Sequence, residues 1–150
     1  MTRERRAAVL AAALTLLGPT AGAAKTGREG KPMKSEWRGS NAARAAEARV
    51  VVDEKEWRDV WKAVGQEPPP ADFTRSVAVA VFLGQRMTGG YGVEFLPPEP
   101  RGDDVELRWR EKTPQGFATQ AITHPWAIKL LPRPKGRVLA TPASPGGSRP

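Results

Sequence analysis

The 150-residue sequence contains no cysteine and a single histidine, His124. The absence of cysteine excludes disulfide bonds, thiol chemistry and the usual cysteine-based zinc sites. The folded state must therefore be stabilised by an ordinary hydrophobic core. A serine–histidine–aspartate triad would have to use His124, but no Gly-x-Ser-x-Gly motif is present to position a nucleophile. We therefore expect no catalytic residues, no bound metal and no cofactor.

Apolar runs long enough to cross a membrane as a helix are also absent. The run Ala7–Leu17 follows a basic start and precedes the small residues Ala21-Gly22-Ala23. This order predicts a secretory signal at residues 1–23, and hence a protein exported to the periplasm or secreted. Retention of the segment as an N-terminal anchor is the alternative. After cleavage we expect no integral membrane segment and, without cysteine, no lipidation.

Acidic residues are the scarcer charged class, with 16 against 24 lysines and arginines, which gives a net charge of +8. Small basic clusters at Lys25–Lys34 and Arg133–Arg137 suit a general attraction to acidic surfaces. Nucleic-acid recognition would require a basic face interleaved with aromatic side chains. The aromatic residues here fall mostly at core spacing, so we expect no nucleic-acid partner.

One helix is marked clearly, at about Glu54–Val64. Asp53 can cap its first turn and Glu56 stands three residues later, as a capping box requires. Four apolar residues recur at helical spacing on one face, and Gly65 follows as a natural end of the helix. We expect this face to pack on a sheet, with its apolar residues in the core: Trp57, Val60, Trp61 and Val64.

The stretch Val77–Phe95 is the predicted centre of the fold. Its first part, VAVAVFLG, is typical of a strand that is buried on both faces. Its last part, YGVEF, alternates as a half-buried strand does. A polar segment ending in Gly89-Gly90 joins the two parts, and such a pattern predicts a hairpin.

Further strands are expected from alternation and from their flanking turns. The clearest are Asp104–Arg110 and Trp126–Leu130, and shorter ones are expected at Arg49–Val52, Phe117–Ile122 and Arg137–Ala140. Short loops join most of them, which favours antiparallel pairing. We therefore predict an α+β fold, a small and mainly antiparallel barrel or sandwich with one amphipathic helix packed on it.

Composition also predicts the division of the chain. A flexible linker is expected at residues 24–35, the folded domain at 36–140 and a disordered tail at 141–150, which is rich in proline, glycine and serine. Within the domain, Asp103-Asp104 could contact calcium, but a solvated turn is favoured.

Two loops are the candidate binding surface, because loops held by a rigid sheet often carry binding residues. Glycines allow the first loop to approach a partner closely, although they could equally serve the turn alone. The second loop is polar and aromatic, and for its tryptophan a place in the core is favoured. The candidate partner-binding residues are Thr88, Gly89, Gly90, Tyr91, His124, Pro125 and Trp126.

The sequence resembles the C-terminal domain family of the protease-complex subunit PrcB. The resemblance covers about Trp37–Ala140, and its most specific elements are Phe-Leu-Gly at 82–84 and Thr-Gly-Gly-Tyr at 88–91. The motifs Asp-Phe at 72–73 and Trp-x-x-x-Trp at 57–61 add to it. It implies an exported accessory protein that associates with, stabilises or restrains a protease.

A more distant similarity links Thr-Gly-Gly-Tyr and His-Pro-Trp to the loops of chagasin-type cysteine-protease inhibitors. That similarity implies that Thr88–Tyr91 and Thr123–Trp126 lie side by side and enter a protease cleft.

The function expected is therefore a non-enzymatic, exported domain that binds a protein partner, a protease, through Thr88–Tyr91. The alternative is an envelope-associated structural domain attracted to acidic surface polymers. A hydrolase that uses His124 is a third class. The first two differ in their response to salt, because charge-driven binding weakens as screening rises.

Overall fold

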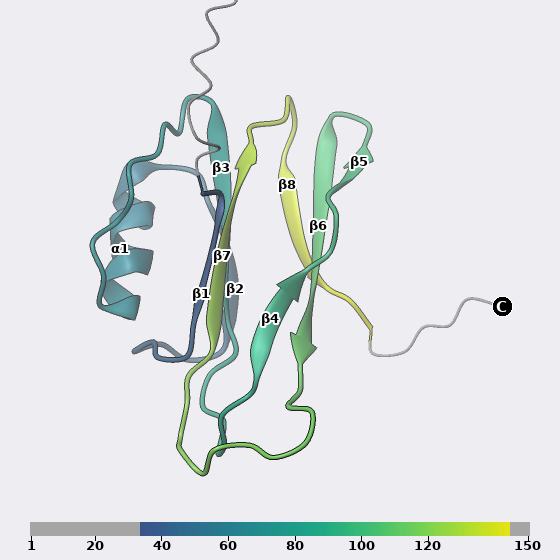
Figure 1. The fold of residues 1–150 in the computed structure, drawn as a ribbon. Helices are drawn as coiled ribbons and strands as arrows, with labels where there is room; N and C mark the ends of the chain where they lie inside the picture. Colours follow the sequence, from purple (N-terminus) through teal and green to yellow (C-terminus); the bar gives the residue numbers. More distant parts are fainter. Residues whose placement is uncertain (1–33, 145–150) are drawn as a thin grey trace, which may run out of the picture. The chain divides into compact units, whose positions relative to one another are not determined.

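The computed structural model describes residues 34–144 (Figure 1). The predicted signal at 1–23 lies outside these residues, as do positions 24–33 of the predicted linker and 145–150 of the predicted tail. The described elements are β1 (Glu36–Gly39), β2 (Glu47–Val51), α1 (Glu54–Val64), β3 (Ser76–Phe82), β4 (Gly92–Phe95), β5 (Glu99–Arg101), β6 (Asp104–Lys112), β7 (Trp126–Pro132) and β8 (Val138–Pro142).

These elements form three layers, with α1 on one face of a first sheet and a second sheet on its other face (Figure 1). The first sheet is antiparallel, in the order β1-β7-β3-β2. In the second, β6 pairs with β4 and β5 in antiparallel fashion and with β8 in parallel. The predicted α+β class is confirmed, and of the two predicted forms the fold is a sandwich, because neither sheet closes into a barrel.

The strand β3 is buried on both faces, as its continuous apolar sequence predicts. Ala78, Ala80 and Phe82 belong to the core beneath α1, whereas Val77 and Val79 belong to the core between the sheets. Successive side chains of a strand point to opposite faces, so one strand serves both cores.

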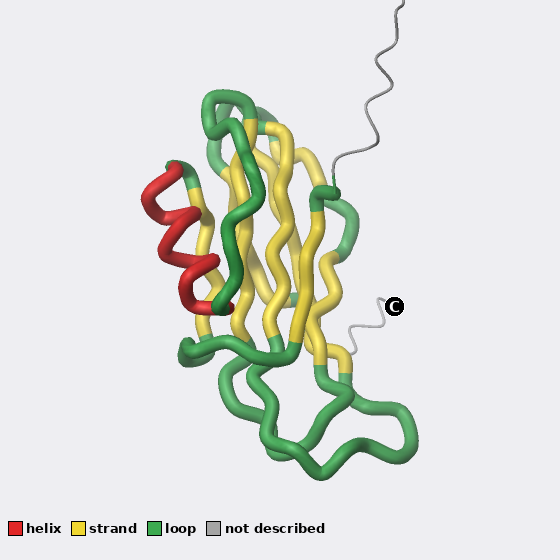
Figure 2. The backbone as a smooth tube through the Cα atoms, turned by 60° about the vertical axis from the view of Figure 1, so that its left-hand side comes forward, coloured by secondary structure: helices red, strands yellow, loops and turns green. Residues whose placement is uncertain are grey.

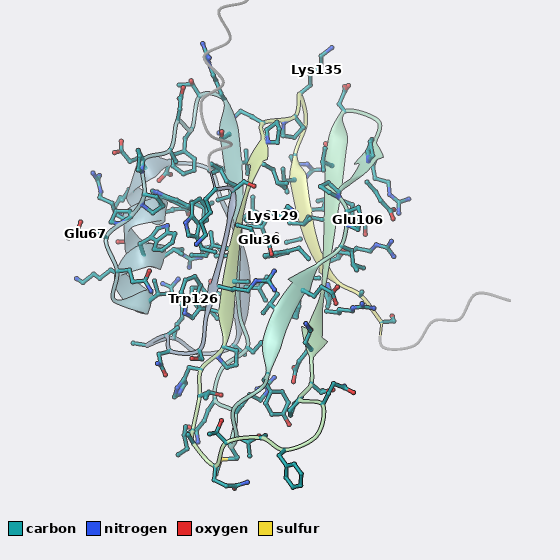
Figure 3. All side chains as sticks on the ribbon, viewed as in Figure 1. Glu36, Glu67, Glu106, Trp126, Lys129 and Lys135 are labelled. Atoms are coloured by element: carbon teal, nitrogen blue, oxygen red, sulfur yellow. The ribbon has the colours of Figure 1, made fainter. Side chains whose placement is uncertain are left out.

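The core beneath α1 is built largely of aromatic rings. Trp61 packs edge to face against Trp37, Trp57 and Trp126, with ring centroids 5.4–5.9 Å apart. Figure 3 shows Trp126 on the α1 side of β7. The predicted helix is confirmed: Asp53 accepts a hydrogen bond from the Glu56 N–H at 2.8 Å. Its tryptophans are core residues, as their helical spacing predicts.

The predicted hairpin at Val77–Phe95 is wrong. β3 and β4 lie in different sheets, and residues 83–91 cross between them. Both edges of β3 are already paired, one with β2 and the other with β7, so β4 has no edge of β3 to join. A polar, glycine-containing segment suits either a hairpin or such a crossing, and the local sequence does not distinguish the two.

Three smaller expectations also differ from the structure. Residues Phe117–Ile122 form no strand, because they pair with no other described strand: only the Thr119 carbonyl among them accepts a backbone hydrogen bond from the β3–β4 segment, from Gly89. The short strands β1 and β5 were not predicted. β8 continues to Pro142, two residues into the predicted tail, because residues 138–142 pair with β6.

Truncation of Trp61, which is 1% exposed, tests the packing of α1. We expect Trp61→Ala to lower the free energy of unfolding by about 3–5 kcal/mol, because a large buried ring leaves a cavity. Urea denaturation followed by far-ultraviolet circular dichroism measures this change. The control Leu139→Ala removes an exposed side chain from β8 and should stay within about 0.5 kcal/mol of the parent. Equal effects of the two substitutions would contradict the packing described.

Candidate partner-binding loops

Two loops lie against each other at one end of the sandwich. They are the β3–β4 loop (residues 83–91) and the β6–β7 loop (residues 113–125), drawn in green at the lower end of Figure 2. Arg86 and Thr123 exchange two backbone hydrogen bonds, of 2.8 and 2.9 Å. The Thr123 hydroxyl donates to the Thr88 carbonyl at 3.0 Å. The structure thus places Thr88 beside Thr123, whereas Gly89 and Gly90 lie against Thr119 and Pro114.

The pairing of β3 with β7 brings the loops together. Phe82 and Trp126 are the last partners of that ladder on this side. The Leu83 N–H then donates to the Pro125 carbonyl at 3.0 Å, and the Arg86–Thr123 bridge follows. The contact between the two chains therefore continues beyond the ladder as far as the Arg86–Thr123 bridge.

Gly89 and Gly90 fasten the two loops. A Cβ atom at Gly89 would lie 2.5 Å from the Thr119 Oγ1, and the Gly89 N–H donates to the Thr119 carbonyl at 2.9 Å. Gly90 has φ +90°, and a Cβ atom there would lie 2.6 Å from the Pro114 Cβ. The turn and the contact between the loops both require glycine here.

The Arg86 side chain orders the β3–β4 loop through its hydrogen bonds, a role that the sequence did not predict. Its Nη1 donates to the Leu83 and Gln85 carbonyls at 2.8 and 3.0 Å. Its Nε and Nη2 donate to the Glu111 carboxylate at 3.1 and 2.7 Å. The hydrogen bond to Glu111 raises the pKa of Arg86. A local sequence pattern could not predict this ion pair, because residues 86 and 111 come together only in the folded structure.

Tyr91 is half-buried beside this cluster. The Arg86 guanidinium lies 5.7 Å from the centroid of its ring, within the range of a cation–π contact. Tyr91 also lines a shallow groove of about 330 Å³ together with Arg38, Lys112 and Trp126.

The other predicted site residues differ in their access to solvent. Thr88 is half-buried and Gly90 is exposed, whereas Gly89 and Pro125 are buried. Trp126 is 2% exposed and lies in the tryptophan core, so the core position favoured for it is confirmed. Their roles in partner binding stay a prediction.

His124 is half-buried, and its backbone N–H donates to the Ser40 carbonyl at 2.7 Å. It lines a second open groove, formed by residues 42–46 and 83–86.

The acidic pair Asp103-Asp104 lies where the β5–β6 turn ends, with Asp103 in the turn and Asp104 at the start of β6. The Asp104 carboxylate accepts a hydrogen bond from the Arg137 N–H at 2.7 Å, so it joins two turns. Within residues 34–144, no three histidine, cysteine or acidic side chains gather in a way that could hold a metal ion. No helix among the described residues has the length and apolar character needed to span a membrane.

Replacing Arg86 tests its role in ordering the loops. In Arg86→Met we expect the amide hydrogens of Gly89 and Thr123 to exchange at least about fivefold faster, because a hydrogen bond to a charged group contributes ~1 kcal/mol or more. Hydrogen exchange measured by NMR reports this change. The control Arg110→Met removes the exposed ion pair with Glu94 and should leave both amides unchanged. Unchanged exchange in Arg86→Met would refute the role assigned to this side chain.

Two glycines on either side of Tyr91 provide a matched comparison. We expect Gly90→Ala to lower the free energy of unfolding by about 1–3 kcal/mol, since alanine would be strained at this backbone conformation and would collide with Pro114. Gly92→Ala should be neutral or slightly stabilising, because nothing lies within 4 Å of its added Cβ atom. Chemical denaturation of both variants measures the difference, and equal stability would contradict the fastening role of Gly90.

The sequence that contains these loops matches a known family model. The family model described as PrcB C-terminal matches residues 77–131, which run from β3 through both loops to β7. No curated protein and no solved structure gives a significant match to the chain. The resemblance to the PrcB C-terminal domain family is confirmed over residues 77–131.

Proposed function

We propose that this protein is an exported, non-enzymatic accessory domain that binds a protease and stabilises or restrains it, with the loop at Thr88–Tyr91 in the contact. The observation that carries the proposal is the fastened pair of loops at one end of the sandwich. The family match supports it, because the matched residues contain both loops. Export rests on the signal pattern at residues 1–23.

The order of the loops favours binding. Backbone hydrogen bonds at Arg86, Gly89 and Thr123 hold both loops before any partner arrives. A surface that is already ordered loses less conformational entropy on association, so more of the contact energy becomes affinity. The accessible parts of Thr88, Gly90 and Tyr91 then supply a contact of fixed shape.

The surroundings of His124 favour binding over hydrolysis. It is the only histidine of the chain, and its loop backbone is tied to Ser40. The groove beside it is open, and its lining includes four alanines together with Arg44, Gln85 and Arg86. The described residues that line it include no hydroxyl, thiol or carboxylate side chain that could act with His124 as a nucleophile or base.

The distribution of ion pairs weakens the charge-driven alternative. Among residues 34–144, every arginine except Arg133 lies within 4.0 Å of a carboxylate oxygen, as Arg101 does with Glu106 at 2.7 Å. Paired cations attract acidic polymers less than free ones. An uncharged contact at the loops suits the proposed function better.

Binding of the full chain to proteases from the native exported fraction tests the proposal. We expect the immobilised protein to retain a protease, detected by its own peptidase activity, with a dissociation constant that changes little between about 0.05 and 0.5 M salt, since uncharged contacts are not screened. Tyr91→Ala should weaken this binding about tenfold or more, because central aromatic side chains dominate interfaces.

The control for this experiment is Leu139→Ala, which lies in β8 away from the loops. Exchange of the Gly89 amide in Tyr91→Ala must match the parent, so that loss of binding is not loss of loop order. Absence of any retained protease would refute the proposed function. Binding that falls steeply with salt would favour the attraction to acidic polymers instead.

A further inference from the structure

The two loops carry an unusual amount of exposed apolar surface. Among residues 34–144, five large hydrophobic side chains are exposed, and three of them belong to these loops. Met87 is 67% exposed, Ile122 is 56% exposed and Phe117 is fully exposed. Single exposed apolar residues are ordinary, but several at one end of a soluble domain mark an interaction site.

The backbone places these side chains on a fixed frame. Met87 directly follows Arg86 and Ile122 directly precedes Thr123, so the Arg86–Thr123 bridge holds the backbone next to both side chains. Phe117 lies between two fastened points of its loop, Pro114 against Gly90 and Thr119 against Gly89.

A bend at Gly116 precedes the phenylalanine. Gly116 has φ +87°, and nothing lies within 4 Å of the position that its Cβ atom would take. The chain thus bends at an open position immediately before Phe117. Because the ring of Phe117 is exposed to water, its burial in a partner would contribute favourable hydrophobic free energy to binding.

The charge pattern indicates what kind of partner fits. Residues 113–124 contain no aspartate, glutamate, lysine or arginine, and neither do residues 87–92, although 27% of the whole sequence is charged. The one charged residue inside the loops, Arg86, is engaged by Glu111. Threonine and glutamine are the main polar residues of these stretches, a composition that suits a protein interface with an apolar centre and a polar rim.

A lipid surface fits this pattern less well. Segments that insert into membranes combine apolar residues with lysine or arginine that meet anionic headgroups. The uncharged stretches 87–92 and 113–124 provide no such cations.

We infer that Phe117 is the principal anchor of the partner contact, and that it enters an uncharged, apolar pocket on a protein partner with Met87 and Ile122 beside it. The inference rests on the proposed function for the identity of that partner as a protease. By this inference the β6–β7 loop contributes the largest part of the binding free energy, whereas the glycines of the β3–β4 loop hold the β3–β4 loop in place.

Photo-crosslinking with the full chain tests this assignment. A benzoylphenylalanine residue replaces Phe117 in one protein and Leu139 in another, and each is irradiated with the native exported fraction. We expect a protein adduct from position 117 that position 139 does not give. The captured protein, once purified, should bind Phe117→Ser about 30-fold more weakly than the parent and Leu139→Ser equally well, as for a dominant interface residue.

Each other outcome overturns the inference in a distinct way. Absence of an adduct from position 117, or equal binding of Phe117→Ser and the parent, removes Phe117 as the anchor. An adduct with a second copy of this chain makes the surface a self-association site. Sedimentation with vesicles of phosphatidylethanolamine and phosphatidylglycerol that requires Phe117 makes it a lipid-binding tip.

The same variants separate this inference from the proposed function. If Tyr91→Ala loses a protease that Phe117→Ser still binds, the proposed function stands and the anchor is wrong. If position 117 captures a protein without peptidase activity, whose binding requires Phe117, the anchor stands and the protease is wrong.

Discussion

The burial of β3 on both faces and along both edges is the constraint on which the rest of the structure depends. One face requires an apolar cover, which the tryptophan side of α1 supplies, and the other requires the second sheet. Both edges are occupied, so the chain that leaves Phe82 must cross to the second sheet. The β3–β4 loop is that crossing. The position of the candidate site therefore follows from how the central strand is paired.

The pairing of β3 with β7 also determines the form of the site. Because the ladder continues past Phe82 and Trp126, the loops that leave the two strands remain in contact and share hydrogen bonds as far as Thr119. Glycines permit the close approach of the two loops. The Arg86 guanidinium donates hydrogen bonds to backbone carbonyls that would otherwise face solvent. Loops of this kind behave as an extension of the rigid sheet, which suits them to present a fixed surface.

Charge and apolar surface are separated in this molecule. The strands of the second sheet carry arginine–glutamate pairs such as Arg110 with Glu94, which keep their outer face hydrated. The loop end instead exposes Met87, Phe117 and Ile122 among uncharged side chains. Ion pairs on open sheet faces discourage unspecific association, and an uncharged end confines association to one place. The separation is what a small binding domain requires.

The sequence by itself determined the local elements. Periodicity and capping residues placed the helix at Glu54–Val64, and a continuous valine-rich run identified the buried strand, because these signals lie within a few residues of each other. Only the tertiary structure decided that the segment after β3 crosses between sheets, that Arg86 meets Glu111 and that Phe117 is left in water. The physical reason is that pairing, ion-pair formation and exposure depend on residues distant in the chain, and a local pattern carries no record of them.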